Sequence, residues 1–508
     1  MIPVQAGAPV GPSPVGRLSA MARDVLVRAV EVYRDDRAVA AWLGAQITRL
    51  DGPLRIAVAG KVKAGKSTLL NALVGEQIAP SDAGECTRVV TWYRAGHQPR
   101  IAMFPRMGTP VPLPVDRRDG ALVIDLQGTR VEDVDHLEVD WPTPGLRLAT
   151  LIDTPGIASM STEVGRRTLR FLNPDDERPT EADAVVYLMR HLHASDAEFL
   201  EAFRDQGVAR AASVNTVAVI SRADEIGGGR ADAMVSARSV ARRYRTEPVL
   251  RGLCQDVVAV AGLLAETSRT LRQVEFAALA ELSRQPREDL DAALLTADRF
   301  LDPAADVAPS AEVRRRLLAR FGVFGLRLGT ILVRQGVDSP AALAAELLDR
   351  SGLHDLQHVL DVQFLGRRDL LKARSSLLAL LRVLDEVPAN DGGRLAADVE
   401  RILTGAHEFV ELRLLSALRS GSVTLPEKPA AEAQTLLGEH GSGIAARLGL
   451  PDGAPPEAVR DAAAAALARW QQRAENPMLS RGAVDASRVV VRTCEGLLAA
   501  VAPAGTGR

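Results

Sequence analysis

The sequence predicts an α/β domain, a mainly parallel sheet with helices on both faces, followed by an elongated all-α helical bundle. Two observations support this prediction. From residue 54 to about residue 265, short β-branched runs alternate with helical patterns, which is typical of an α/β sheet. After residue 266 these runs give way to long amphipathic patterns separated by Gly- and Pro-rich breaks.

Length and composition limit the class of protein. A chain of 508 residues exceeds what one hydrophobic core usually organises, so two or three domains are expected. Apolar content of 47% and a formal net charge of -2 indicate an ordinary globular protein without a broad nucleic-acid surface. Cys86, Cys254 and Cys494 are far apart and favour a reducing cytoplasm over disulfides or a zinc site. No apolar run reaches the roughly 18 residues of a membrane span, and we expect no secretion signal.

The elements can be assigned in chain order. Residues 1–18 and 502–508 are rich in Gly and Pro and are predicted to be disordered. Residues 19–50 have apolar positions at helical spacing and predict a helix before the first strand. Seven strands are predicted, at 54–60, 88–96, 122–126, 148–156, 182–190, 214–224 and 256–262.

Residues 60–67, GKVKAGKS, match the G-x-x-x-x-G-K-[ST] pattern of a P-loop in its required context, after a strand and before a helix. Gly60 and Gly65 let backbone N–H groups turn toward phosphate oxygens. Lys66 can reach the β and γ phosphates, and the Ser67 hydroxyl can ligate Mg²⁺. The predicted phosphate-binding residues are Gly60, Lys63, Ala64, Gly65, Lys66, Ser67 and Thr68.

A second motif, LIDTPGI at 151–157, ends a predicted strand with Asp153. That position suits the second magnesium carboxylate of a P-loop enzyme, and the N–H of Gly156 can approach the γ-phosphate. An ordinary strand-ending turn is the alternative for this stretch.

A third motif, Ser221-Arg222-Ala223-Asp224, is a version of the [NT]KxD guanine motif at the end of another predicted strand. Asp224 would accept two hydrogen bonds from guanine, whereas adenine would leave its carboxylate unpaired, so the motif favours GTP over ATP. The stem of Arg222 could lie along the base, and Ser221 departs from the usual residue. A surface loop is the alternative.

Between the first two motifs, residues 85–96 occupy the place of a loop that senses the γ-phosphate. Thr87 is predicted to close over Mg²⁺ and to help place the attacking water, with Thr91 as the competing candidate. The predicted metal ligands are therefore Ser67, Thr87 and Asp153.

These motifs, GKSTLLNALVG, Thr87-Arg88, LIDTPGI and SRAD, with a helix before them and a long helical region after them, resemble the bacterial dynamin-like proteins. Within that family, RIAVAGKVKAGKSTLLNALVG, SRADEIGGGR and LLARFGVFGLRLG are similar to the actinobacterial isoniazid-inducible (IniC-type) group. The resemblance implies a GTPase domain at 51–265, joined through helix 19–50 to a helical neck and trunk at 266–501.

The same resemblance implies hydrolysis of GTP to GDP and phosphate with Mg²⁺, and binding or remodelling of membrane lipids at the inner face of the plasma membrane. It also implies an oligomer with itself or with an IniA-like relative. By analogy, the loops at 387–393 and 421–430 are candidate membrane contacts. The alternative is a GTP-regulated scaffold or partner subunit with little intrinsic hydrolysis.

Lys63 departs from the dynamin pattern, which has a serine there that helps hold a monovalent cation; guanylate-binding proteins and atlastins have a catalytic arginine. Our hypothesis is that Lys63 supplies this positive charge in cis, so that turnover needs no added K⁺. A solvated loop lysine is the alternative. Because Ile157 stands where some GTPases have a water-orienting glutamine, hydrolysis is expected to be slow.

Two weaker patterns lie in the helical half. His354 and His358 share one helix face, and a solvated or packed pair is expected rather than a metal site. The basic turn at 365–374 could contact anionic lipid, although a solvated helix face is the preferred interpretation.

Overall fold

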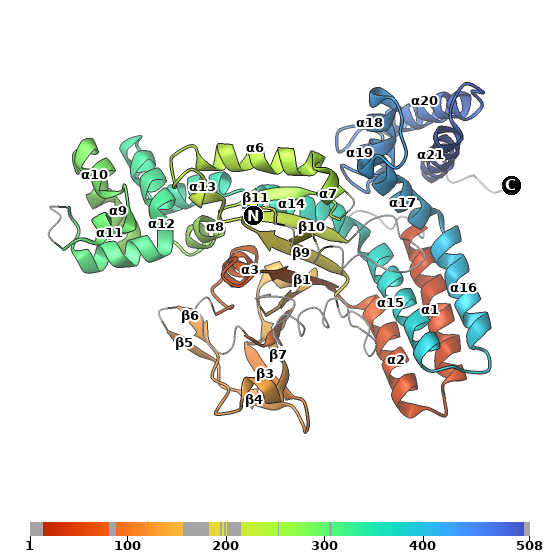
Figure 1. The fold of residues 1–508 in the computed structure, drawn as a ribbon, viewed down its shortest axis with the longest axis horizontal. Coiled ribbons are helices and arrows are strands. Elements are labelled where there is room, and N and C mark those ends of the chain that lie inside the picture. The colour runs from red at the N-terminus through yellow and green to blue at the C-terminus, as the bar shows by residue number, and fades with distance from the viewer. Residues whose placement is uncertain are drawn as a thin grey trace.

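A computed structural model describes residues 14–80, 88–118, 120–155, 182–193, 196–197, 200, 215–251, 253–303 and 307–501. In this part of the chain, nine strands form one sheet in the order β11-β10-β9-β1-β8-β2-β7-β3-β4 (Figure 1). They are β1 (Leu54–Gly60), β2 (Val90–Ala95), β3 (Arg100–Pro105), β4 (Val111–Leu113), β7 (Val134–Trp141), β8 (Ala149–Asp153), β9 (Ala184–Met189), β10 (Thr216–Ser221) and β11 (Val257–Val260).

The five strands β8, β1, β9, β10 and β11 run parallel to one another, and β2 pairs antiparallel with β8. The mainly parallel sheet is thereby confirmed. Strands β9 and β10 are buried along their whole length, which explains their unbroken apolar sequence. Because parallel strands end at the same edge, the residues that follow β1, β8, β10 and β11 come close together.

Four strands were not predicted: β3, β4, β7 and β5 (Asp116–Arg118). Strand β7 alternates buried and more exposed residues, so its sequence VDHLEVDW has no apolar run. The predicted strand at 122–126 corresponds to β6 (Ala121–Val123), which pairs with β5 outside the nine-stranded sheet. These misses lie beyond β2 in the nine-stranded sheet or in the β5–β6 pair, away from the five strands β8, β1, β9, β10 and β11.

Helices cover both faces of the sheet, as predicted. One face, with Ile56 and Val58 of β1, packs against residues of α3 (Lys66–Val74), α8 (Gly262–Arg269) and α14 (Leu353–Gln363). The opposite face, with Ala57 and Ala59, shares its core with α6 (Ala233–Thr246), α7 (Pro248–Arg251) and α13 (Pro340–Arg350). The alternation of β1 side chains between two cores is the expected consequence of the strand period.

The N-terminal region holds two helices where the sequence predicted one. Helix α1 spans Pro14–Val32, beginning inside the stretch predicted to be disordered, and α2 spans Arg37–Asp51. The break occurs because the Asp36 carboxylate accepts hydrogen bonds from the N–H groups of Ala38 and Val39, both at 3.1 Å, and so caps α2.

The helical residues after the sheet form three groups (Figure 1). Helices α9 (Gln273–Ser283), α10 (Arg287–Ala293), α11 (Ala297–Leu301) and α12 (Ala311–Arg334) extend one core of the sheet. Helices α15 (Arg368–Glu386) and α16 (Gly392–Gly405) form a bundle with α1 and α2 around a separate core. A third core joins α17 (His407–Ser420), α18 (Glu427–Leu436), α19 (Ile444–Arg447), α20 (Pro456–Ala474) and α21 (Arg481–Ala500).

The basic turn at 365–374 is packed inside the helical half at three of its cationic positions. Both interpretations of the basic turn at 365–374 were wrong at its key positions, because Arg367, Lys372 and Arg374 are buried, where they meet neither lipid nor solvent. Lys372 Nζ instead donates to the carbonyls of Leu50 and Gly52, which ties α15 to the end of α2. Within the described residues, no helix has the length and apolarity needed to cross a membrane.

Candidate nucleotide-binding site

The loop after β1 has the backbone of a phosphate-binding turn. Gly60 has φ +149°, and a Cβ placed there would lie 2.5 Å from the Leu188 carbonyl oxygen of β9, so only glycine fits. Gly65 has φ +88° and stands at the N-cap of α3. The loop therefore aims its N–H groups, and the positive end of the α3 dipole, at one point above the sheet.

Lys66, Ser67 and Asp153 meet beside this loop. Lys66 is buried, and its Nζ lies 3.3 Å from the carbonyl oxygen of Gly60 and 3.4 Å from that of Lys61. Burial lowers the pKa of Lys66, and the Asp153 charge opposes that shift. Ser67 Oγ donates to Asp153 Oδ2 at 2.8 Å across 86 residues of sequence. The first two motifs are thus in direct contact.

Asp153 has the surroundings expected of a cation ligand. Its side chain is buried, and its Oδ1 has no hydrogen-bond partner among the described residues. Burial raises the pKa of Asp153, while Lys66 and Ser67 act in the opposite direction. A buried carboxylate oxygen without a donor is costly. A hydroxyl and a carboxylate oxygen side by side fit a hard cation such as Mg²⁺.

The third motif shares a cavity with the P-loop. Ser221, Arg222 and Asp224 line a cavity of about 160 Å³ together with Ala64, Gly65 and Thr68. Burial raises the pKa of the Asp224 carboxyl. Ser221 Oγ donates to the Met189 carbonyl at 3.3 Å, which fixes the end of β10 to β9. Arg222 has φ +51°, and its guanidinium pairs with Glu225 at 2.7 Å.

Further residues that line this cavity were not predicted from the sequence. Gly262 and Leu263, directly after β11, and Leu188 of β9 line it as well. The rule that ligands bind beyond the carboxyl ends of parallel strands could have identified Gly262, because the predicted strand 256–262 ends on it.

An ion pair between half-buried Lys61 and a buried carboxylate, which the sequence analysis also missed, supports the P-loop. Lys61 Nζ lies 3.1 Å from Asp196 Oδ1, and Asp196 is fully buried. The same carboxylate accepts hydrogen bonds from the Tyr187 hydroxyl at 2.8 Å and from the His193 N–H at 3.0 Å. Asp196 therefore anchors the second residue of the loop to β9 and the segment after it.

Of the remaining predicted residues, the structure describes Lys63 and Thr91. Lys63 is exposed and has φ +63°, a left-handed backbone that is unfavourable for a residue with a Cβ. Thr91 lies opposite Asp153 in the β2–β8 register, but it is buried and its hydroxyl donates to the Val89 carbonyl at 3.4 Å. Thr87 and Gly156 lie outside the described residues, so their roles stay predictions.

The two histidines of α14 are exposed, as the solvated interpretation expects. His354 pairs with Asp349 at 3.1 Å, and His358 is exposed. In the described part of the chain, no group of three or more His, Cys, Asp or Glu side chains is arranged to hold a metal ion.

A mainly parallel sheet with a P-loop after its first strand, and with two further motifs at the same edge, defines a P-loop nucleotide-binding fold. Residues 56–218 match the Dynamin family, and the chain belongs to this family. It is 43% identical over 472 residues to the isoniazid-induced protein IniC of Mycobacterium tuberculosis (strains CDC 1551 / Oshkosh and H37Rv), an alignment that covers 93% of this chain and 95% of that protein.

Two other proteins are similar over different extents. The bacterial dynamin-like protein of Nostoc punctiforme is 29% identical over 150 residues, which are 27% of this chain and 20% of that protein. A solved chain of an oligomerised bacterial dynamin pair, described as providing a mechanism for long-range sensing and tethering of membranes, aligns with 97% of this chain and 81% of its own, at 14% identity and a TM-score of 0.32.

Proposed function

We propose that this chain is a GTPase that binds GTP with Mg²⁺, hydrolyses it to GDP and phosphate, and couples the reaction to conformational change and to membrane binding or remodelling. The observation that most supports this is the shared site: the P-loop cavity also contains Asp224, and Asp153 beside the loop has an oxygen without a partner among the described residues.

The binding residues divide by the part of the ligand they would hold. The loop from Gly60 to Gly65 and Lys66 hold the phosphates through backbone N–H groups and one ammonium. Asp224 selects guanine, since its ionised carboxylate can accept from two guanine donors. Ser67 and Asp153 would hold Mg²⁺, with Thr87 as the predicted third ligand. When bound, this ion neutralises charge on the phosphate oxygens.

The chemistry that these residues can perform is electrostatic. In phosphoryl transfer to water, negative charge builds up between the β and γ phosphates, and catalysis comes from positioning and from positive charge at that place. Lys66 supplies one such charge, and Lys63 is our candidate for a second. Thr87 and the N–H of Gly156 are the proposed groups that orient the attacking water, since no glutamine follows DTPG.

Coupling to the helices is supported by a contact at the base cavity. Helix α12 is kinked at Gly322, where φ is +62° and ψ is 176°. A Cβ at Gly322 would lie 3.8 Å from Asp224 Oδ2, so α12 passes directly behind the guanine-binding carboxylate. A base that draws Asp224 into the cavity would change the packing of this kink, and this gives the nucleotide a route to the helical half.

The proposed membrane binding rests on family membership, because no helix among the described residues is long and apolar enough to span a membrane. We propose peripheral attachment at the inner face of the plasma membrane, through the loops at 387–393 or 421–430, in an oligomer with itself or an IniA-like relative. The first of these loops joins α15 to α16 at one end of the helical bundle (Figure 1).

The test is hydrolysis of GTP and of ATP by the purified chain and by Lys66→Ala, followed by flotation with liposomes with and without the IniA-like relative. We expect GTP-selective turnover that Lys66→Ala abolishes, and GTP-dependent flotation. GTP binding without turnover or flotation would favour the scaffold alternative. Failure to bind GTP would refute the proposal as a whole.

A further inference from the structure

A second cleft lies at the other end of β11 from the nucleotide site. Gly262 and Leu263 follow the end of β11 and line the base cavity, whereas Asp256 and Val257 at its start line this cleft. The cleft has a volume of about 710 Å³, within the roughly 300–1,000 Å³ that is typical of small-molecule sites. Both sites thus lie along one four-residue strand, which is about 13 Å long.

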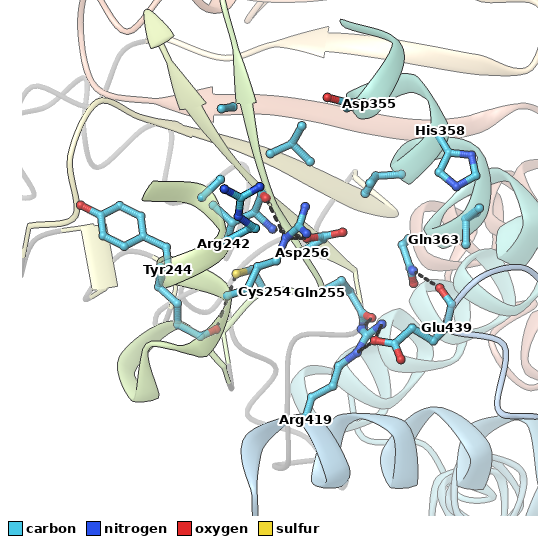
Figure 2. Close-up of a pocket in the computed structure, with 18 of the residues that line it drawn as sticks. Arg242, Tyr244, Cys254, Gln255, Asp256, Asp355, His358, Gln363, Arg419 and Glu439 are labelled. Atoms are coloured by element: carbon cyan, nitrogen blue, oxygen red, sulfur yellow. Dashed lines mark hydrogen bonds and ion pairs between the residues drawn. The ribbon is translucent and has the colours of Figure 1, made fainter. Parts of the chain in front are cut away.

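The walls of the cleft come from both halves of the molecule (Figure 2). Helix α6 and the start of β11 form one wall, and α14, α17 and the loop after α18 form the other. The sheet and the third helical group are linked here by the contact between Arg419 on α17 and Gln255 before β11. A ligand in this cleft would therefore touch both halves at once.

The charges that face the cleft favour an anion. Arg238, Arg242 and Arg245 are spaced i, i+4 and i+7 on α6, so they share one helix face. Arg419 faces them from the opposite wall. The carboxylates that line the cleft are Asp256, Asp355 and Glu439, one fewer than the guanidinium groups.

Each carboxylate is already engaged by one arginine. Arg245 pairs with Asp256 at 2.5 Å, Arg238 with Asp355 at 3.4 Å, and Arg419 with Glu439 at 3.1 Å. Arg242 is left without a carboxylate partner among the described residues, and its guanidinium lines the cleft. The exposed imidazoles of His358 and His440 line the same space and can donate further hydrogen bonds.

The rest of the lining is apolar or neutral. Val359 and Val362 of α14 and Leu418 of α17 contribute aliphatic surface. Gln363 is buried beside them, donates to the Glu439 carbonyl at 2.9 Å, and has an Oε1 without a hydrogen-bond partner in the described structure. A mixed lining of this kind suits an organic anion better than a bare inorganic ion.

We propose that this cleft binds a small organic phosphate, whose phosphate group is held by Arg242 and whose organic part lies against the aliphatic residues of α14 and α17. Guanidinium is the side chain best matched to phosphate oxygens, because it can donate two parallel hydrogen bonds. The phosphate can belong to a free metabolite or to a lipid headgroup, since both present the same chemistry to Arg242.

The test measures phosphate binding outside the P-loop. The full chain is saturated with GDP and Mg²⁺ and titrated by calorimetry with glucose 6-phosphate and with glycerol 3-phosphate. Vesicles of phosphatidylcholine with phosphatidic acid are tested by co-sedimentation. All measurements are repeated in Lys66→Ala, so that the result does not depend on the proposed GTPase function or on phosphate binding at the P-loop.

Arg242→Ala is the test variant and Arg243→Ala its matched control, because Arg243 is the next residue on α6, does not line the cleft, and lies over the Tyr244 ring at 5.6 Å. We expect Arg242→Ala to weaken binding by about tenfold or more and Arg243→Ala to leave it unchanged. Dependence on Arg242 with the soluble probes supports a free phosphate, and dependence with vesicles alone supports a headgroup. No binding, no effect of Arg242→Ala, or an equal loss in Arg243→Ala would overturn the proposal.

Discussion

Two buried carboxylates, Asp153 and Asp183, lie at opposite edges of the same sheet and differ in what surrounds them. Asp153 ends β8 and has one oxygen without a partner among the described residues. Asp183 directly precedes β9, and its oxygens accept from Arg49 Nη2 at 2.5 Å, from the Arg55 N–H at 2.9 Å and from Ser375 Oγ at 2.6 Å. When protein groups donate hydrogen bonds to both oxygens of a buried carboxylate, the carboxylate is saturated and holds structural elements together. When one oxygen has no protein donor, the carboxylate is open and can bind a ligand.

The elements joined by Asp183 explain why saturation matters there. Arg49 belongs to α2, Ser375 to α15, and both side chains are buried. Lys372 adds its hydrogen bonds to the carbonyls of Leu50 and Gly52. This cluster fixes the helical bundle to the edge of the sheet opposite the nucleotide site, so any movement of the bundle relative to the sheet must change it.

The largest effect is expected from breaking the saturated site. Asp183→Asn would remove the charge that pairs with the buried guanidinium of Arg49 and destabilise the folded chain by about 3–5 kcal/mol. The measurement is the urea midpoint of the first unfolding transition. Glu31→Gln is the control, because Glu31 pairs with Arg34 at 2.9 Å on the surface and its loss should cost under about 1 kcal/mol. Equal midpoints for the two variants would contradict the structural role of Asp183.

The open site should behave in the opposite way. Asp153→Asn is expected to lower Mg²⁺-dependent GTP hydrolysis by about 100-fold or more, because one metal ligand and its charge are lost. The stability of the ligand-free chain should stay the same or rise, since the cost of burying a charged carboxylate with one unpartnered oxygen disappears. Turnover assays and urea unfolding of one preparation test both parts. A loss of stability similar to that of Asp183→Asn would show that the two carboxylates do not differ in kind.

The base cavity offers a test of selectivity. Asp224→Ala should weaken GTP binding by about 10- to 100-fold and leave ATP binding unchanged, because the two guanine donors lose their acceptor. The neighbouring variant Glu225→Ala removes an exposed carboxylate that pairs with Arg222 and should change GTP binding by less than about threefold. Equilibrium titration with fluorescent GTP and ATP analogues distinguishes the two. Equal losses of GTP and ATP would contradict a role in base recognition.

Asp153 also predicts a pH dependence. Burial raises its pKa in the folded chain above the ordinary value of 3.8, so between these values the folded state binds more protons than the unfolded state. The ligand-free chain should therefore gain stability as pH falls through that window, while Mg²⁺ affinity decreases because protons compete for the carboxylate. Thermal melts and Mg²⁺ titrations from about pH 7 to pH 4 test this. Asp153→Asn should remove the share of Asp153 and so reduce the pH dependence of both, while other buried carboxyls with raised pKa, such as Asp224, keep contributing to the melts.

A site can be predicted from the sequence when its residues are close together in the sequence, and not when they come from distant segments. The P-loop and the SRAD motif are continuous stretches, so Gly60, Lys66 and Asp224 could be proposed as site residues from the sequence alone. The clusters of Asp183 and Asp196 could not, because their partners lie far away in sequence: Arg49 and Ser375 are 134 and 192 residues from Asp183, and Lys61 is 135 from Asp196.

The same reasoning explains the successes and misses in the fold. The fully buried parallel strands have apolar sequences that predict them. Strand β7 alternates in exposure, and the turn before α2 depends on one capping carboxylate, Asp36, so neither gives a strong local pattern. The partnership of α1 and α2 with α15 is a contact across more than 300 residues, shown by Lys372 and Leu50, which no local pattern contains.

The smallest effect is expected at Lys63, and it separates charge from backbone shape. Because Lys63 has φ +63°, Lys63→Gly should relieve strain and stabilise the chain relative to Lys63→Ala by about 1 kcal/mol. If the ammonium supplies positive charge between the phosphates, both variants should lower hydrolysis by about tenfold, and the wild type should turn over equally in Na⁺ and K⁺. A K⁺-dependent wild type, or full activity in Lys63→Ala, would refute that role. A rate that falls in Lys63→Ala but not in Lys63→Gly would assign the effect to the shape of the loop, because glycine keeps the left-handed turn without the charge.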